Sequence, residues 1–218
     1  MTTSTWLLFI TISLLTAFSP GPAVLLAISN AIAWGPRKTL FGSSLGSVVG
    51  IFTVSAAAMA GLGTLLHSSA WLFAALKTAG AVYLIYLGWR QWTSKNSMFD
   101  KPQMAEVSDS KVQKIQKTQA DLARQGLLVS LTNPKSILFF TALFPQFIHV
   151  ESPMLPQFLA LTAVFAACAL SSHVVYVLLA RQLQGWFSTP RRASLFNRVC
   201  GGAFGLLGLG LLRLKNPA

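Results

Sequence analysis

The chain contains few charged residues and very few acidic ones. Of its 218 residues, 10% are charged and 53% are hydrophobic. A soluble domain of average composition carries about 25% charged residues, so this composition argues against a water-soluble protein. The long apolar runs contain none of the five acidic residues, which are Asp100, Glu106, Asp109, Asp121 and Glu151.

Cysteine is also scarce. Cys168 and Cys200 both lie in apolar stretches, where a thiol behaves as a small hydrophobic residue. Their number and spacing do not match a disulfide framework or a clustered metal site. The sequence also lacks HExxH, GxSxG and paired intramembrane carboxylates, so we expect no catalytic residue, no metal site and no cofactor.

Apolar residues are concentrated in long runs, and a run of about 18 or more indicates a membrane helix. Six spans are predicted, and they leave no room for a folded soluble domain. Their approximate ranges are 6–30, 40–66, 70–92, 126–148, 154–180 and 199–214. The predicted fold class is therefore an all-α membrane protein with six transmembrane helices.

The net charge of +12 at pH 7 indicates orientation rather than a nucleic-acid partner. Thirteen Lys and Arg residues fall in the loops on one side of the six spans, and two fall on the other side. Because cytoplasmic loops carry the excess of Lys and Arg, we expect both termini to be periplasmic and the central loop, 93–125, to be cytoplasmic. Within this loop, Val112, Ile115, Gln119 and Leu122 share one side of a helical wheel. This pattern fits either an interfacial helix that contacts membrane lipids or a solvated linker.

The central loop separates two predicted three-helix repeats, 1–92 and 126–218. Because each half has three spans, a duplicated half must enter the membrane in the opposite direction, which makes the repeats inverted. The pattern GAxxLxxLG that begins at Gly80 recurs from Gly202. This similarity is weak, since these residue types are common in membrane helices.

The first span of each half is interrupted by proline. Pro20 and Pro22 lie in the first span and Pro134 lies in the fourth, at corresponding positions. Proline has no N–H group and its ring disturbs the preceding turn, so nearby backbone groups lose their helical partners. In hydrocarbon, this is tolerated only where protein or a polar cavity satisfies those groups.

Two interrupted helices at matching places are typical of transporters that bind substrates between inverted repeats. A pair of structural kinks is the alternative. The residues expected to bind a substrate are Ser19, Pro20, Gly21, Pro22, Asn133, Pro134 and Lys135.

Two intramembrane side chains are candidates for a functional role. Lys135 follows the fourth-span break, at a depth where a lysine costs roughly 2.5 to 3.5 kcal/mol unless it is hydrated or partnered. It is expected to attract a substrate carboxylate; the alternatives are snorkelling and pairing with carbonyls of a broken helix. His173 is the candidate for ion coupling, with a neutral, hydrogen-bonded histidine as the alternative.

Gly42, Gly46 and Gly50 recur every four residues on one face of the second span. Small residues at this spacing permit close helix approach, so we interpret this face as a packing surface. A substrate path and the seam of a homodimer are the alternatives.

Three segments carry a family resemblance: FSPGPAVLLAISNAIAWGPRKTLFGSSLGSVVG, GAVYLIYLGWRQW and LTNPKSILFFTALFPQF. In this order they resemble the lysine exporter superfamily, in particular its homoserine and threonine efflux branch. The resemblance implies a bacterial inner-membrane secondary transporter that exports amino acids or related small metabolites by alternating access, driven by the proton or ion gradient.

The substrate class follows from a departure within this resemblance. Lysine and arginine exporters of the superfamily tend to have an intramembrane Asp, whereas this chain has Ser43, Ser44 and Ser47 in the comparable region. A neutral substrate such as homoserine, threonine or leucine is therefore expected. The alternatives are a metal-ion or other small-solute exporter of the superfamily and a structural membrane protein without transport activity.

Overall fold

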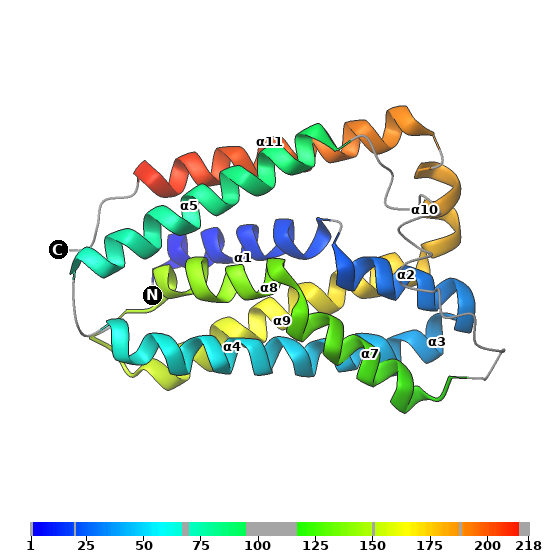
Figure 1. Cartoon of the computed structure of the whole chain (residues 1–218), viewed down its shortest axis with the longest axis horizontal. Coiled ribbons are helices and arrows are strands. Elements are labelled where there is room, and N and C mark those ends of the chain that lie inside the picture. Colours follow the sequence, from blue (N-terminus) through cyan, green and yellow to red (C-terminus); the bar gives the residue numbers. More distant parts are fainter. Residues whose placement is uncertain are drawn as a thin grey trace.

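The computed structural model describes residues 2–19, 21–66, 70–94, 117–149, 151–187 and 189–213. Every regular element within these ranges is a helix. Most helices run along the length of an elongated bundle, and the first and last described residues lie at the same end of it (Figure 1). The all-α fold class is thereby confirmed.

The helices of the first half correspond to the first three predicted spans. They are α1 (Thr3–Phe18), α2 (Pro22–Trp34), α3 (Pro36–Thr39), the π-helix η1 (Leu40–Ser44), α4 (Leu45–Leu66) and α5 (Ala70–Thr93). Between α1 and α2 the chain bends by 51°. The predicted interruption of the first span is therefore observed, although Pro20 itself lies outside the described residues.

The second half contains a similar bend of 50°, between α7 and the helices that follow it. Its elements are α7 (Gln119–Thr132), α8 (Pro134–Leu138), the π-helix η2 (Phe139–Leu143), the 3-10 helix η3 (Phe144–Phe147), α9 (Met154–Leu178), α10 (Ala180–Phe187) and α11 (Pro190–Arg213). The predicted interruption at Pro134 is thus also observed.

Two continuous segments, Pro36–Ala60 and Met154–Leu178, are long and apolar enough to cross a membrane. The two bent pairs each qualify as a broken span, so the described residues contain two to four candidate spans. The helices α5 and α11 pack along each other on one side of the bundle (Figure 1). The count of six spans stays a prediction.

Two helices begin earlier in the chain than the spans predicted within them. The fourth span was expected from residue 126, but α7 begins at Gln119 because Thr118 and Asp121 form a reciprocal capping box. Leu122, expected on a surface helix or in a linker, is fully buried in α7, whereas Val112 and Ile115 lie outside the described residues.

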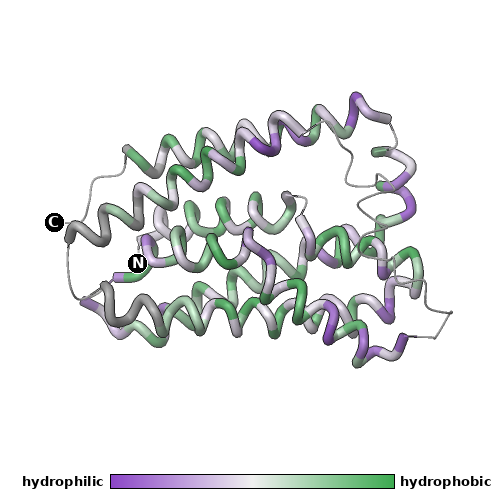
Figure 2. Tube along the Cα trace, viewed as in Figure 1, coloured by the Kyte–Doolittle hydropathy of each residue, from purple (hydrophilic) through white to green (hydrophobic). Residues whose placement is uncertain are grey.

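The sixth span was expected from residue 199, but α11 begins at Pro190. Proline is favoured in the first turn of a helix, where its missing N–H is not needed. The polar residues that follow, Arg191 and Arg192, extend the helix beyond the apolar run from which we predicted the span. Hydrophilic segments are concentrated where α10 lies and α7 begins (Figure 2).

The glycine face of the second span packs against α7. A Cβ atom added at Gly42 would lie 2.8 Å from the Leu122 Cβ, and one added at Gly46 would overlap the carbonyl oxygen of Ala123. At Gly50 the added atom would lie 2.6 Å from the Ser130 Cβ. All three glycines therefore permit the close approach of α4 and η1 to α7.

Buried phenylalanines fill the core near the end of the bundle where the chain begins. Phe9 of α1 contacts Phe147 with a ring separation of 4.9 Å, and Phe139 contacts Phe165 at 4.3 Å. We call this set, with Phe144, the aromatic cluster. Its side chains are at most 3% exposed, so they close this part of the bundle.

Candidate functional site

The C-terminal end of α1 receives the side chain of Lys135 from the other half of the chain. The Lys135 Nζ atom donates hydrogen bonds of 2.7 Å to the carbonyl oxygens of Thr16 and Ser19. The last carbonyls of a helix lack intrahelical partners and carry partial negative charge, so an ammonium group is favourable there. Among the alternatives for Lys135, the structure shows pairing with the carbonyls of a broken helix.

Two side chains of α9 donate hydrogen bonds to the carbonyl oxygens of Ala17 and Phe18, which lie between Thr16 and Ser19 in the chain. Ser172 Oγ donates a 2.8 Å hydrogen bond to the Ala17 carbonyl, and Tyr176 Oη donates a 2.6 Å hydrogen bond to the Phe18 carbonyl. Neither residue was predicted from the sequence to have a role. Their spacing of four residues, which places both on one face of a membrane helix, was the available signal.

The helices that follow the two breaks begin in a similar way. Pro22 starts α2 and Pro134 starts α8, each in the first helical turn. The Asn133 side chain caps α8 by accepting a 3.1 Å hydrogen bond from the Lys135 backbone N–H. No side chain caps α2, and a Cβ atom added at Gly21 would lie 3.2 Å from Lys135 Nζ. Lys135 thus lies directly beside the start of α2.

A small cavity lies where these elements meet. It has a volume of about 40 Å³ and is lined by both broken helices together with α4 and α9. A water molecule needs roughly 10 to 15 Å³, so the cavity has room for about three waters. An amino acid does not fit, and its binding requires these helices to move apart.

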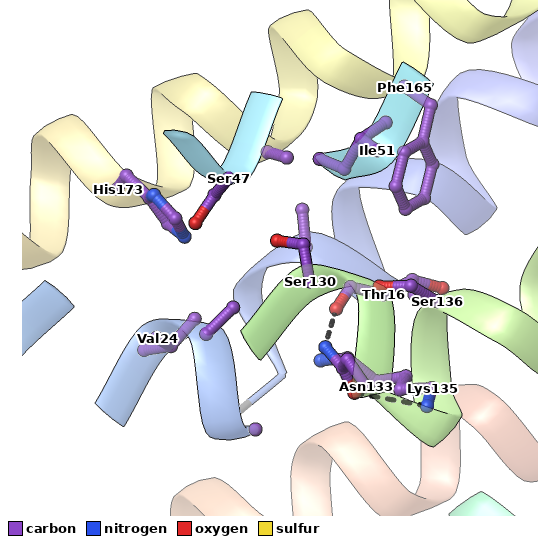
Figure 3. Close-up of a pocket in the computed structure, with 14 residues that line it drawn as sticks. Thr16, Val24, Ser47, Ile51, Ser130, Asn133, Lys135, Ser136, Phe165 and His173 are labelled. Atoms are coloured by element: carbon purple, nitrogen blue, oxygen red, sulfur yellow. Dashed lines mark hydrogen bonds between the residues drawn. The ribbon is translucent and has the colours of Figure 1, made fainter. Parts of the chain in front are cut away.

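Most of the surface that lines the cavity is apolar, and several hydroxyl, amide and imidazole side chains interrupt it. Figure 3 shows Ser47, Ser130, Asn133 and His173 around the cavity, with Lys135 at its edge. Lys135 is the one charged side chain among the described lining residues. A neutral environment of hydroxyl and amide groups beside a single cation is suited to a ligand that carries both charges on neighbouring atoms.

His173 belongs to the same site. Its side chain is 4% exposed and lines the cavity, and it makes no hydrogen bond to another described residue. The structure therefore places the coupling candidate in the same cavity as Gly21, Asn133 and Lys135. Gly42, Gly46 and Gly50 are not among the residues that line the cavity; they pack against α7.

Broken apolar helices that meet around a buried cavity characterise this fold and site, and comparison with known proteins identifies the family. The chain matches the LysE type translocator family over residues 14–215 and belongs to it. The matched segment includes both breaks and all residues that line the cavity.

Individual relatives agree with this assignment. The chain is 32% identical to an uncharacterized membrane protein of Vibrio cholerae, with 95% of each chain covered. It is also 32% identical to a protein of Salmonella typhimurium named "Homoserine/homoserine lactone efflux protein", covering 95% of this chain and 96% of that one. A membrane protein of Bacillus subtilis, YrhP, is 26% identical over 94% of this chain and 96% of its own. No solved structure matches the chain.

Proposed function

We propose that the protein is an inner-membrane secondary transporter that exports small neutral amino-acid-like metabolites, such as homoserine, threonine or leucine. The observation that carries this proposal is the cavity at the junction of the two broken helices. Its lining combines backbone at both breaks, one lysine and several hydroxyl groups. The Salmonella relative named for homoserine and homoserine lactone efflux supports this class of substrate.

The proposed architecture is six spans in two inverted repeats that work by alternating access. It is supported by two bends of 51° and 50° at corresponding places in the two halves. The third helix of each half, α5 or α11, packs against its counterpart. In this arrangement a substrate binds between the repeats, and rocking of one repeat against the other exposes the site alternately to each side.

The proposed orientation places both termini in the periplasm. The end of the bundle that contains α3, α10 and the start of α7 then faces the cytoplasm (Figure 1). Arg37, Lys38 and Arg181 lie at that end, as the positive-inside rule requires.

The proposed binding mode uses both kinds of helix end. The ammonium group of Lys135 has three donors, and two of them are engaged with α1 carbonyls. The third donor and the first-turn amides of α2 near Gly21 would bind the substrate carboxylate. The substrate ammonium would bind the Asn133 side-chain oxygen and nearby oxygens such as those of Ser19 and Ser130.

Coupling to the proton or ion gradient is proposed to involve His173, because it lines the cavity without a hydrogen bond to another described residue. Export of a metal ion or of another small solute is the alternative within the family. For the metal alternative, no group of three or more His, Cys, Asp or Glu side chains in the described part of the chain is placed to hold an ion.

The test is transport by purified protein in liposomes with an imposed proton gradient. We expect homoserine, threonine or leucine to be transported against its concentration gradient, whereas lysine and arginine are not. Protein-free liposomes, and liposomes in which the gradient has been dissipated, are the controls. Transport of lysine in preference to every neutral amino acid would overturn the substrate class, and transport of divalent metal ions alone would favour the alternative.

A further inference from the structure

Four polar side chains on one side of the cavity each have a buried atom that lacks a hydrogen-bond partner. They are Asn30, Ser43, Ser44 and Gln125, with the unpaired atoms Nδ2, Oγ, Oγ and Oε1. Most buried polar atoms in native proteins are hydrogen-bonded, so a group of unpaired atoms indicates a place for water or a ligand. We call these four residues the inner polar cluster.

The inner polar cluster comes from α2, η1 and α7, three elements that pack against one another. Asn30 lies seven residues, or two helical turns, beyond Ala23, which lines the cavity. Ser43 lies about one turn before Ser47, which also lines the cavity. The cluster therefore extends the polar lining from the cavity toward the end of the bundle where α2 ends and α7 begins.

The π-helix η1 turns two consecutive serines inward. Ser43 and Ser44 are both fully buried, whereas Phe41 and Leu45 on either side are 61% and 44% exposed. A π-bulge inside a helix frequently marks a functional site, because it changes which side chains face the interior. Here it adds two hydroxyl groups to the interior at one level of the bundle.

Aromatic side chains pack together on the opposite side of the cavity. Phe165 lines the cavity and packs against Phe139 at a ring separation of 4.3 Å, and the rest of the aromatic cluster lies beyond them. These rings leave a hydrophobic barrier on the side that we assign to the periplasm. Three further unpaired polar atoms belong to side chains of α1 and η3 on this side: Ser13 Oγ, Thr16 Oγ1 and Gln146 Nε2.

We propose that the inner polar cluster is the route by which the substrate passes between the cytoplasm and the cavity. This inference rests on the proposed function and specifies the path for it. The side chains are uncharged and offer donors and acceptors, so they can accompany both the ammonium and the carboxylate of a zwitterion. They contain no fixed charge that would retain one end of it.

Cysteine accessibility tests the route without requiring transport. In a background in which Cys168 and Cys200 are replaced by Ala, Ser43→Cys would be exposed to a membrane-impermeant methanethiosulfonate in inside-out vesicles. The matched control is Phe41→Cys, two residues away on the exposed surface of the same helix. We expect at least about tenfold faster labelling at position 43, because a thiol reacts as the thiolate, which forms in a hydrated path and not in hydrocarbon.

The direction of labelling, protection by substrate and a second cysteine position complete the experiment. Labelling of Ser43→Cys should be much slower in right-side-out vesicles, and homoserine should slow it in inside-out vesicles. Asn30→Cys provides a second probe if Ser43→Cys does not insert. A rate at positions 43 and 30 no higher than at position 41, or faster labelling from the periplasmic side, would overturn the route.

The outcome also separates this inference from the proposed function. If no amino acid is transported but position 43 is labelled from the inside, the route stands as a hydrated path and the proposed substrate class fails. If neutral amino acids are transported and positions 43 and 30 are not labelled, the route is wrong while the proposed function stands.

Discussion

Lys135 and Ser19, which lie in different halves of the chain, are joined by a 2.7 Å hydrogen bond from the Lys135 ammonium group to the Ser19 carbonyl oxygen. The same ammonium group donates to the Thr16 carbonyl, also at 2.7 Å. The break in the second half thereby supplies the partner for carbonyls at the break in the first half. These two hydrogen bonds connect the break in the second half directly to the break in the first.

The first prediction concerns replacement of Lys135 by methionine, which removes the charge but keeps a flexible chain of similar size. Two carbonyls would lose their partners, and each buried polar group left unsatisfied costs about 1 to 3 kcal/mol. We expect Lys135→Met to unfold at a lower temperature and to lose transport. Thermal unfolding in detergent and transport in liposomes measure the two effects separately.

Substrate analogues distinguish a role of Lys135 in binding the substrate carboxylate from its role as the hydrogen-bond partner of the α1 carbonyls. If Lys135 binds the carboxylate, Lys135→Met should impair transport of homoserine far more than transport of homoserine lactone, which has no free carboxylate. Lys135→Arg should rescue only in part, because guanidinium differs in shape and hydrogen bonding. Equal loss for both compounds would make Lys135 a purely structural residue. Ser172→Ala, which removes one neutral donor to α1, is the matched control for the loss of support.

The second prediction concerns the prolines at the breaks. Pro20→Ala and Pro134→Ala each permit a more continuous helix, because alanine restores the N–H donor that proline lacks. We expect each variant to insert at normal abundance and to transport substrate more slowly. Normal transport by both would mean that the breaks are simple kinks.

The breaks were predictable because they depend on local chemistry. A proline inside an apolar run disrupts a helix wherever the run lies in the fold, and Pro22 and Pro134 each start a new helix. The capping box of Thr118 and Asp121 was also present in the sequence. It was missed because the following residues are polar, and the span was located by hydrophobicity alone.

The partners of the α1 carbonyls were not predictable in the same way. Ser172 and Tyr176 are far from α1 in sequence, and their role depends on how α9 is rotated about its axis. That rotation is fixed by packing among several helices. Lys135 is recognisable in the sequence as a costly intramembrane charge, but only the fold shows that carbonyl oxygens of α1 are its partners.

The third prediction is the orientation of the chain. Cysteine probes at position 3, in the first turn of α1, and at position 114, in the central loop, should be labelled from opposite sides of the membrane. In intact cells whose outer membrane has been permeabilised, we expect an impermeant reagent to reach position 3 and not position 114, because the Lys and Arg excess is cytoplasmic. Disruption of the inner membrane should expose position 114. The reverse pattern would invert the assignment of every loop, including the direction of the inner polar cluster.

The fourth prediction tests the close approach of α4 to α7. A Cβ atom added at Gly46 would overlap the carbonyl oxygen of Ala123, which is backbone and cannot rotate away. Overpacking of this kind costs about 1 to 3 kcal/mol. We expect Gly46→Ala to lower the unfolding temperature of the purified protein by several degrees. Transport should also fall, because Ser47 of α4 and Ser130 of α7 both line the cavity.

Gly205→Ala is the matched control, in α11. A Cβ atom added there meets no heavy atom within 4 Å, and alanine is the better helix former. We therefore expect this variant to keep the unfolding temperature and transport rate of the parent protein. If Gly46→Ala behaves like Gly205→Ala in both measurements, α4 and α7 are not held in close contact. The glycine face would then be open to the alternatives of a substrate path or a seam between two copies of the chain.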